Sequence, residues 1–260
     1  MRYLFDTHCH LDDAAYDGDR DSVINELAAK MESILWCGTD LATSSMAAEY
    51  AKKHGFIYCA CGYYPHQTQG LNSQKHLLEQ LLLQEKCVAV GEIGLDYHYD
   101  GVCADKQREA LCLQLEIAKQ HRLPVILHER DALCDMLSIL KEQQVSSGVI
   151  HCFSGSKETA KQYLDMGLNI SFTGLLTFKN AKNAPEAAAY APRERIMIET
   201  DSPYMTPVPF RGERNTPDRV ALVAARLAEI WGVEPEEAAY ITYQNACKLF
   251  NIKNTTAKEG

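Results

Sequence analysis

The chain has 260 residues, of which 46% are hydrophobic, and its formal net charge at pH 7 is -9. This length fits one large domain, and the apolar fraction with ordinary glycine and proline content excludes a disordered or repeat protein. The acidic balance argues against a general nucleic-acid scaffold, although bound metals can supply positive charge at a local site.

Short β-rich runs recur along the chain and alternate with amphipathic segments that have helical spacing. Arg108–His121 is one such helix, and Ser156–Met166, which opens with a serine cap, is another. Helices are also expected to start near Pro217 and at Pro235. The eight expected strands are Tyr3–Phe5, Ser33–Cys37, Phe56–Cys61, Cys87–Val90, Pro124–Leu127, Gly148–Ile150, Leu168–Phe172 and Arg195–Ile198.

Alternating strands and helices predict parallel βαβ units, and eight of them close into an α/β fold of the (β/α)8 TIM-barrel type. An open, doubly wound sheet is the alternative, because strands are easily miscounted from sequence. We expect a single domain over residues 1–252, followed by a polar tail over residues 253–260.

Two histidines stand two residues apart, shortly after the first expected strand. Side chains at this spacing on an extended segment point to the same side, so His8 and His10 can face one metal ion. An isolated pair of this kind is more often two unrelated histidines, because short motifs match by chance.

Further residues of metal-ligand type follow later strands. In a (β/α)8 barrel the C-terminal strand ends surround one mouth, where active sites lie. Taken singly, a histidine after a strand is usually a hydrogen-bonded core residue, and an aspartate there could cap a turn. Six such groups at five strand ends are hard to obtain by accident, which favours a metal site. The candidate ligands are His8, His10, Glu92, His128, His151 and Asp201.

Six protein ligands exceed the three or four that one catalytic zinc uses, and they suit two divalent cations that share a carboxylate. We predict Glu92 as the shared ligand, because the fourth strand faces the first, fifth and sixth across the mouth. The imidazoles favour zinc, manganese or iron, whereas the carboxylates suit magnesium, so the metal stays open. The expected sets are His8, His10 and Asp201 for one ion, and His128 and His151 for the other.

Six stretches of the chain carry a family resemblance. They are Asp6–Asp12, Gly91–Tyr97, His128–Ala132, His151–Gly155, Glu199–Tyr204 and Pro207–Asn215. In this order they resemble the motifs of the TatD family of metal-dependent deoxyribonucleases, within the amidohydrolase-like barrels. The resemblance spans essentially the whole chain, and it is to the branch that keeps both N-terminal histidines.

The resemblance implies a two-metal TIM-barrel hydrolase of phosphodiesters, and most specifically an exonuclease acting on DNA. We expect Asp201 and Glu92 to be catalytic, with Asp201 orienting the attacking water and accepting its proton. The resemblance also implies that His66 contacts the substrate phosphate. The family often has a histidine where this chain has Tyr64, which cannot take up a proton near neutral pH.

Four further residues are weaker candidates for a role at the site. Arg211 and Arg214 lie in a Pro/Gly-rich loop that could fold over the mouth and contact the substrate, and a pair of solvated arginines is an equally good interpretation. Asp96 and Tyr97 are expected to orient the ligands.

Two other functions stay open. The first is hydrolysis of carboxylic esters or amides, for example by an aminoacyl-tRNA deacylase, because the same activated water can attack a carbonyl. The second is a non-catalytic binding protein that keeps its metals for stability.

The ten cysteines include no Cys-x-x-Cys pair, and many lie in apolar runs, so we expect reduced thiols and a cytoplasmic protein. No stretch approaches the ~20 apolar residues of a membrane span. No obligate protein partner is indicated.

Overall fold

The computed structural model of the chain describes residues 1–253. All but the first residue of the expected polar tail, 253–260, lies outside the described residues. In the described part, eight parallel strands form one sheet in which each strand pairs with the next along the chain. The strands are β1 (Phe5–Cys9), β2 (Ser33–Cys37), β3 (Ile57–Cys61), β4 (Cys87–Asp96), β5 (Val125–Arg130), β6 (Gly148–Ile150), β7 (Asn169–Phe172) and β8 (Ile196–Ile198).

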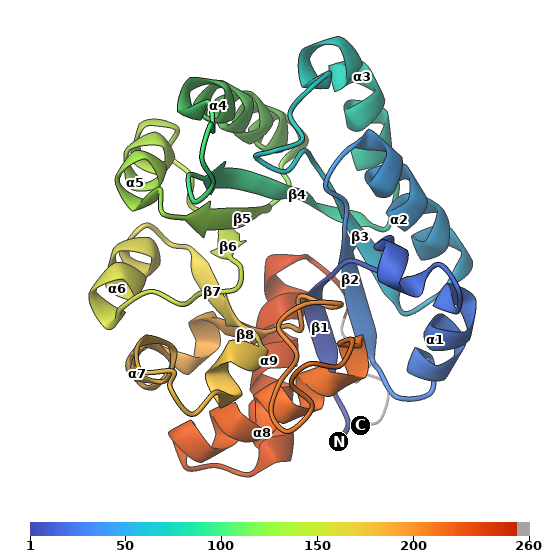
Figure 1. The fold of residues 1–260 in the computed structure, drawn as a ribbon, viewed down its shortest axis with the longest axis vertical. Helices are drawn as coiled ribbons and strands as arrows, with labels where there is room; N and C mark the ends of the chain where they lie inside the picture. Colours follow the sequence, from blue (N-terminus) through green and yellow to red (C-terminus); the bar gives the residue numbers. More distant parts are fainter. Residues whose placement is uncertain (254–260) are drawn as a thin grey trace.

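The first and last strands meet, so the sheet curves into a nearly closed barrel (Figure 1). Beyond the end of β8 the chain continues along β1: the amide of Asp201 donates to the carbonyl of His8 at 2.9 Å, and the amide of His10 donates to that of Ser202 at 2.8 Å. The strand order follows the chain without a reversal, which excludes the doubly wound alternative. The (β/α)8 prediction is confirmed.

Helices surround the strands, as Figure 1 shows. Short 3-10 helices lie at Ala14–Tyr16, Gly174–Thr177, Arg193–Arg195 and Pro217–Arg219. The α-helices are α1 (Arg20–Leu27), α2 (Leu41–Lys53), α3 (Leu71–Leu82), α4 (Ala104–His121), α5 (Leu133–Glu142), α6 (Lys157–Asp165), α7 (Asn183–Tyr190), α8 (Val220–Trp231) and α9 (Pro235–Leu249). None of the described helices is long and apolar enough to span a bilayer.

The expected bounds of β1, β4 and β5 are too short at their C-terminal ends; β5 runs to Arg130, and β1 begins at Phe5 and not at Tyr3. β1 continues from Phe5 through His8, and β4 continues past Val90 to Asp96. In both strands the added residues include buried polar side chains, which break the apolar pattern by which a strand is recognised in sequence. His8 therefore lies inside β1 and His10 directly after it.

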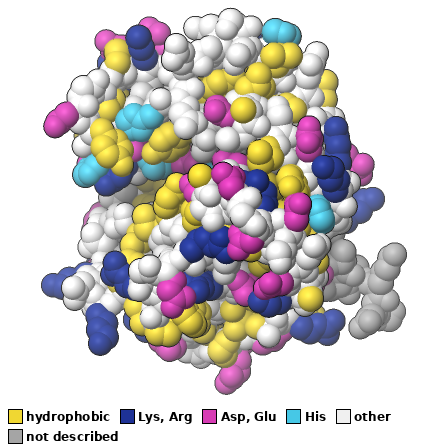
Figure 2. Space-filling model, turned by 45° about the vertical axis from the view of Figure 1, so that its right-hand side comes forward, with side chains coloured by type: hydrophobic (Ala, Val, Ile, Leu, Met, Phe, Trp, Pro, Cys, Tyr) yellow, Lys and Arg dark blue, Asp and Glu magenta, His cyan; other side chains and the backbone are white. Residues whose placement is uncertain are grey.

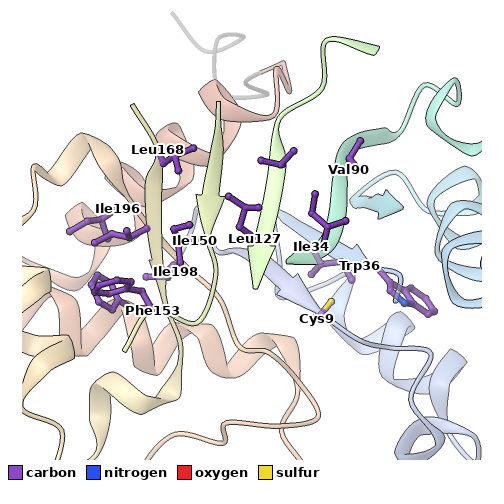
Figure 3. Packing of buried hydrophobic residues seen from close by; sticks show 14 of the residues in the cluster. Cys9, Ile34, Trp36, Val90, Leu127, Ile150, Phe153, Leu168, Ile196 and Ile198 are labelled. Atoms are coloured by element: carbon purple, nitrogen blue, oxygen red, sulfur yellow. The ribbon is translucent and has the colours of Figure 1, made fainter. Parts of the chain in front are cut away.

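The apolar side chains form two clusters. The larger lies between the strands and the surrounding helices, and Figure 3 shows part of it, including Trp36, Leu127 and Ile198. The smaller fills the barrel interior around Phe5 and is continued by residues of α9 such as Tyr243 and Ala246. A filled interior leaves the C-terminal mouth of the barrel as the place for a polar site.

Candidate metal centre

The structure brings all six candidate ligands together at the C-terminal mouth. They come from β1 and the residue after it, from β4 and β5, and from the segments that directly follow β6 and β8. A pocket of about 550 Å³ opens onto five of them, and His8 lies buried behind it. Figure 2 shows histidine side chains gathered at a hollowed edge of the molecule. The lining of the pocket includes His10, Glu92, His128, His151 and Asp201.

Glu92 lies between two pairs of histidines. Its Oε2 atom is 3.4 Å from Nε2 of His8 and 3.4 Å from Nε2 of His10. Its Oε1 atom is 2.9 Å from Nδ1 of His128 and 2.8 Å from Nε2 of His151. One carboxylate oxygen therefore faces each pair, the arrangement that a ligand shared by two ions requires.

Asp201 lies beside the first pair. Its Oδ1 atom is 3.5 Å from Nε2 of His10 and 3.9 Å from Nε2 of His8. The backbone of Asp201 has φ of 55°, in the left-handed region. Asp201 therefore adds a second carboxylate on the side of His8 and His10.

The ring nitrogens form a donor set that fits metal ions. Nε2 of His8 lies 3.0 Å from Nε2 of His10, and Nδ1 of His128 lies 3.1 Å from Nε2 of His151. Nδ1 of His10 is 3.0 Å from the carbonyl oxygen of Cys37, which can only accept, so this nitrogen carries the hydrogen and Nε2 presents its lone pair. Convergent lone pairs need a cation or a proton between them, so the set fits two divalent cations.

The buried carboxylates and imidazoles of the site shift each other's pKa values. Burial alone would raise the pKa of Glu92, but the charge of His151 and hydrogen bonds from His10 and His128 hold it well below its usual range. Burial opposes protonation of His151, yet Glu92 and Glu199 raise its pKa well above the ordinary value. Protons on the histidines thus supply the positive charge that metal ions would bring.

Glu199 is a buried acid to which the sequence analysis assigned no role. One of its oxygens lies 3.4 Å from Nδ1 of His151 and accepts the amide of Cys152 at 2.6 Å. The other accepts the hydroxyl of Ser171. These bonds fix the carboxylate where it can orient the His151 ring. The sequence did contain one indication of this residue: Glu199 stands two residues before Asp201, at the end of a barrel strand.

Asp96 also contacts a candidate ligand, as expected. Its Oδ2 atom is 3.5 Å from Nε2 of His128 and accepts the hydroxyl of Tyr64 at 2.9 Å. Tyr64 therefore takes part in holding this side of the site. Tyr97 was expected to orient a ligand as well, but its hydroxyl donates instead to Asp135 at 2.8 Å.

His66 lies at the edge of this group. Its Nε2 atom is 3.3 Å from Oδ2 of Asp96, and its side chain is 30% exposed. It lines a neighbouring hollow together with Lys106, and its ring contacts that of Tyr99, which does line the mouth.

The two arginines lie apart from the ligands. Arg214 makes a two-bond ion pair with Asp19, at 2.7 Å for each bond, so the structure does not bring it to the mouth. Arg211 lies 3.9 Å over the ring of Phe178. It lines a second cleft on the same face of the barrel, of about 660 Å³.

The fold and this donor set are those of a TIM-barrel metal-dependent hydrolase. Residues 5–251 match the family described as TatD related DNase, and the chain belongs to the TatD family of metal-dependent hydrolases.

Similar proteins cover nearly the whole chain. The chain is 43% identical to the uncharacterized metal-dependent hydrolase YabD of Bacillus subtilis, over 96% of this chain and 99% of that protein. It is 38% identical to the uncharacterized metal-dependent hydrolase YcfH of Escherichia coli, over 96% of each. Among solved structures, the TatD homologue YjjV of Escherichia coli superposes with a TM-score of 0.91 at 32% identity, covering 96% of this chain and 99% of that one.

Proposed function

We propose that the protein is a two-metal phosphodiesterase that acts on DNA as a deoxyribonuclease, removing nucleotides from a strand end. The observation that carries this proposal is the position of Glu92, with one oxygen toward each pair of histidines. Two dications would carry twice the charge of the two ligand carboxylates, and the further acids Asp96 and Glu199 lie on the outer ring nitrogens of His128 and His151, so the ions would face the mouth with positive charge that suits an anionic phosphate.

Asp201 is the proposed general base. When bound, two divalent cations in such a site lower the pKa of a water and offset the negative charge of a phosphodiester. Burial would raise the pKa of Asp201, but hydrogen bonding from His10 and the charges of the histidines lower it below its ordinary value. The carboxylate is therefore ionised at neutral pH and able to accept the proton of the attacking water.

The rim of the mouth supports a nucleic-acid strand as substrate. Tyr99 and Tyr204 both line the mouth and are 55% and 53% exposed. Exposed aromatic rings are stacking surfaces for unpaired bases. The guanidinium of Arg130 lies 5.5 Å from the ring centre of Tyr99 and brings a positive charge to the same rim.

The cleft lined by Arg211 extends this binding surface. It also holds Lys179 and Lys182, and none of these three cations makes an ion pair within residues 1–253. Unpaired cations on the face of the metal centre suit the phosphates that follow the reacting one along a strand.

A metal-reconstitution series on single-stranded DNA labelled at either end tests the proposal, with zinc, manganese, magnesium and iron compared. Stepwise loss of nucleotides from one end is the expected result. Asp201→Asn should lower kcat by ~10²–10⁴-fold, the usual contribution of a proton-transfer group. It should retain the ion held by His128 and His151. A variant within a few-fold of wild type under saturating metal would rule Asp201 out as the base.

The same preparations on mischarged tRNA and on simple carboxylic esters test the rival activity. Hydrolysis of those substrates and not of DNA would replace the proposed function with an ester hydrolase. Metal binding without any hydrolysis would instead support a non-catalytic protein. We expect the enzyme to work in the cytoplasm, because all ten cysteines are free thiols in the described chain.

A further inference from the structure

Three cysteines converge away from the metal centre, on the outer side of β3 and β4. Cys59 and Cys61 are two residues apart on β3 and so lie on the same side of the sheet. Cys87 begins β4 and pairs with Cys59 across the two strands. All three side chains are buried in the apolar cluster between the strands and the helices.

Their sulfur atoms lie close enough to share one ion. The three Sγ atoms are all within 4.8 Å of one another, and those of Cys61 and Cys87 are 3.5 Å apart. Metal–sulfur bonds of ~2.3 Å require sulfur–sulfur separations of about 3.8 Å in tetrahedral and about 4.0 Å in trigonal geometry. The observed spacing therefore meets this requirement with small side-chain adjustments.

A buried cysteine is usually just a small apolar side chain. Cys9, Cys37 and Cys247 are buried in this way, and among residues 1–253 none of them joins a group of three close thiols. The clustering of Cys59, Cys61 and Cys87 is what separates them from the others.

A positive charge lies beside the cluster. The ammonium of Lys86, the residue before Cys87, donates to the carbonyl oxygens of His54, Gly55 and Ile57 at 2.7, 2.6 and 2.8 Å. These bonds hold the charge at the edge of the barrel near the three sulfurs. A fixed cation offsets part of the negative charge that several thiolates would bring into an apolar region.

We propose that Cys59, Cys61 and Cys87 form a thiolate site for a soft d10 metal ion, separate from the centre at the mouth. On binding, three sulfur–metal bonds form, three S–H bonds break, and the protons pass to solvent. No histidine or carboxylate of residues 1–253 joins the three sulfurs at this spacing, so the site offers three ligands. Closed zinc sites use four, which favours monovalent copper over zinc.

Spectroscopic titration tests the site independently of catalysis. Reduced protein would be titrated without oxygen with Zn²⁺, with Cd²⁺ as a spectroscopic substitute, and with Cu⁺ held by a competing chelator. Thiolate-to-metal charge-transfer absorption reports sulfur ligands, and the imidazoles and carboxylates at the mouth do not give it. We expect this absorption to saturate at one Cd²⁺ or one Cu⁺ per chain, and the bound ion to raise Tm.

Variants assign the absorption to these residues. Cys61→Ala should remove it, whereas Cys247→Ala, which also truncates a buried cysteine, should leave it unchanged. As a measurement that needs no variant, the bound ion should slow alkylation of Cys59, Cys61 and Cys87 of the wild-type chain in urea that opens the metal-free protein enough to expose these buried thiols. Absence of the absorption with Cd²⁺ and Cu⁺, or protection confined to other cysteines, would overturn the proposal. Tighter binding of zinc than of copper would keep the site and correct the preferred ion.

Discussion

Glu92 is the candidate ligand that lies between the two pairs of histidines. Its oxygens lie 3.4 Å from one pair of histidines and 2.8 to 2.9 Å from the other. Glu92→Gln keeps the shape of the side chain but removes the shared negative charge. We therefore expect lower metal occupancy at both positions and loss of nearly all activity, with metal content measured by elemental analysis.

His8→Ala is the comparison for this variant, because it removes a donor from one pair only. It should weaken mainly the ion that is placed beside Asp201. Two metals per chain in Glu92→Gln would contradict the bridging role of the carboxylate.

A variant of His66 can distinguish substrate binding from metal binding. Its contact with Asp96, at 3.3 Å, leaves the side chain partly exposed, and the six candidate ligands converge without it. His66→Ala should leave metal content unchanged and lower kcat/KM on DNA by about tenfold or more, as expected for a lost charge-assisted hydrogen bond. Loss of a metal from the variant would instead make His66 a ligand.

The candidate ligands could be predicted from sequence because each is a chemically distinctive side chain at a strand end. The contact of Glu199 with His151 could not be predicted, because a buried acid beside a candidate ligand looks the same in sequence as a helix cap or a surface charge. The position of Arg214 could not be predicted either. Its partner Asp19 lies 195 residues away in sequence, and only the folded chain brings the two together.

At the scale of elements, the number and order of the strands followed from the alternation of apolar runs and helical segments. The C-terminal ends of β1, β4 and β5, which carry candidate ligands, were missed. His8 and Glu92 are polar residues inside strands, and they stay buried because neighbouring groups of the site face them. Polar residues of the candidate site thus interrupt the apolar pattern by which these strand ends would be recognised in the sequence.

The start of α6 was predicted correctly from the sequence. Ser156 precedes the helix, and its hydroxyl accepts the amide of Thr159 at 3.2 Å. Ser156→Ala should lower the free energy of unfolding by about 1 kcal/mol, the usual value of a helix cap, as measured by urea denaturation. Ser156→Asp keeps an acceptor at the cap and should stay close to wild type. Equal losses in the two variants would show that the cap is not the cause.

The whole molecule is acidic, yet unpaired cations lie on the face that carries the metal centre. Lys179 and Lys182 share the cleft of Arg211, and in a (β/α)8 barrel this face receives the substrate. The net charge of -9 disfavours non-specific binding of DNA, so these few cations should have a large share in holding a strand.

Charge reversal at both lysines, Lys179→Glu with Lys182→Glu, tests this distribution of charge. We expect kcat/KM on a long single strand to fall at least tenfold, with little change on a dinucleotide that is too short to reach the cleft. The dependence of binding on salt should also become weaker, because fewer counterions are released. Lys119→Glu with Lys141→Glu is the matched control. These lysines lie in the last turns of α4 and α5, which in this fold end at the opposite face of the barrel. An equal loss in the control pair would assign the effect to net charge, and an equal loss on the dinucleotide would place the lysines at the reacting phosphate.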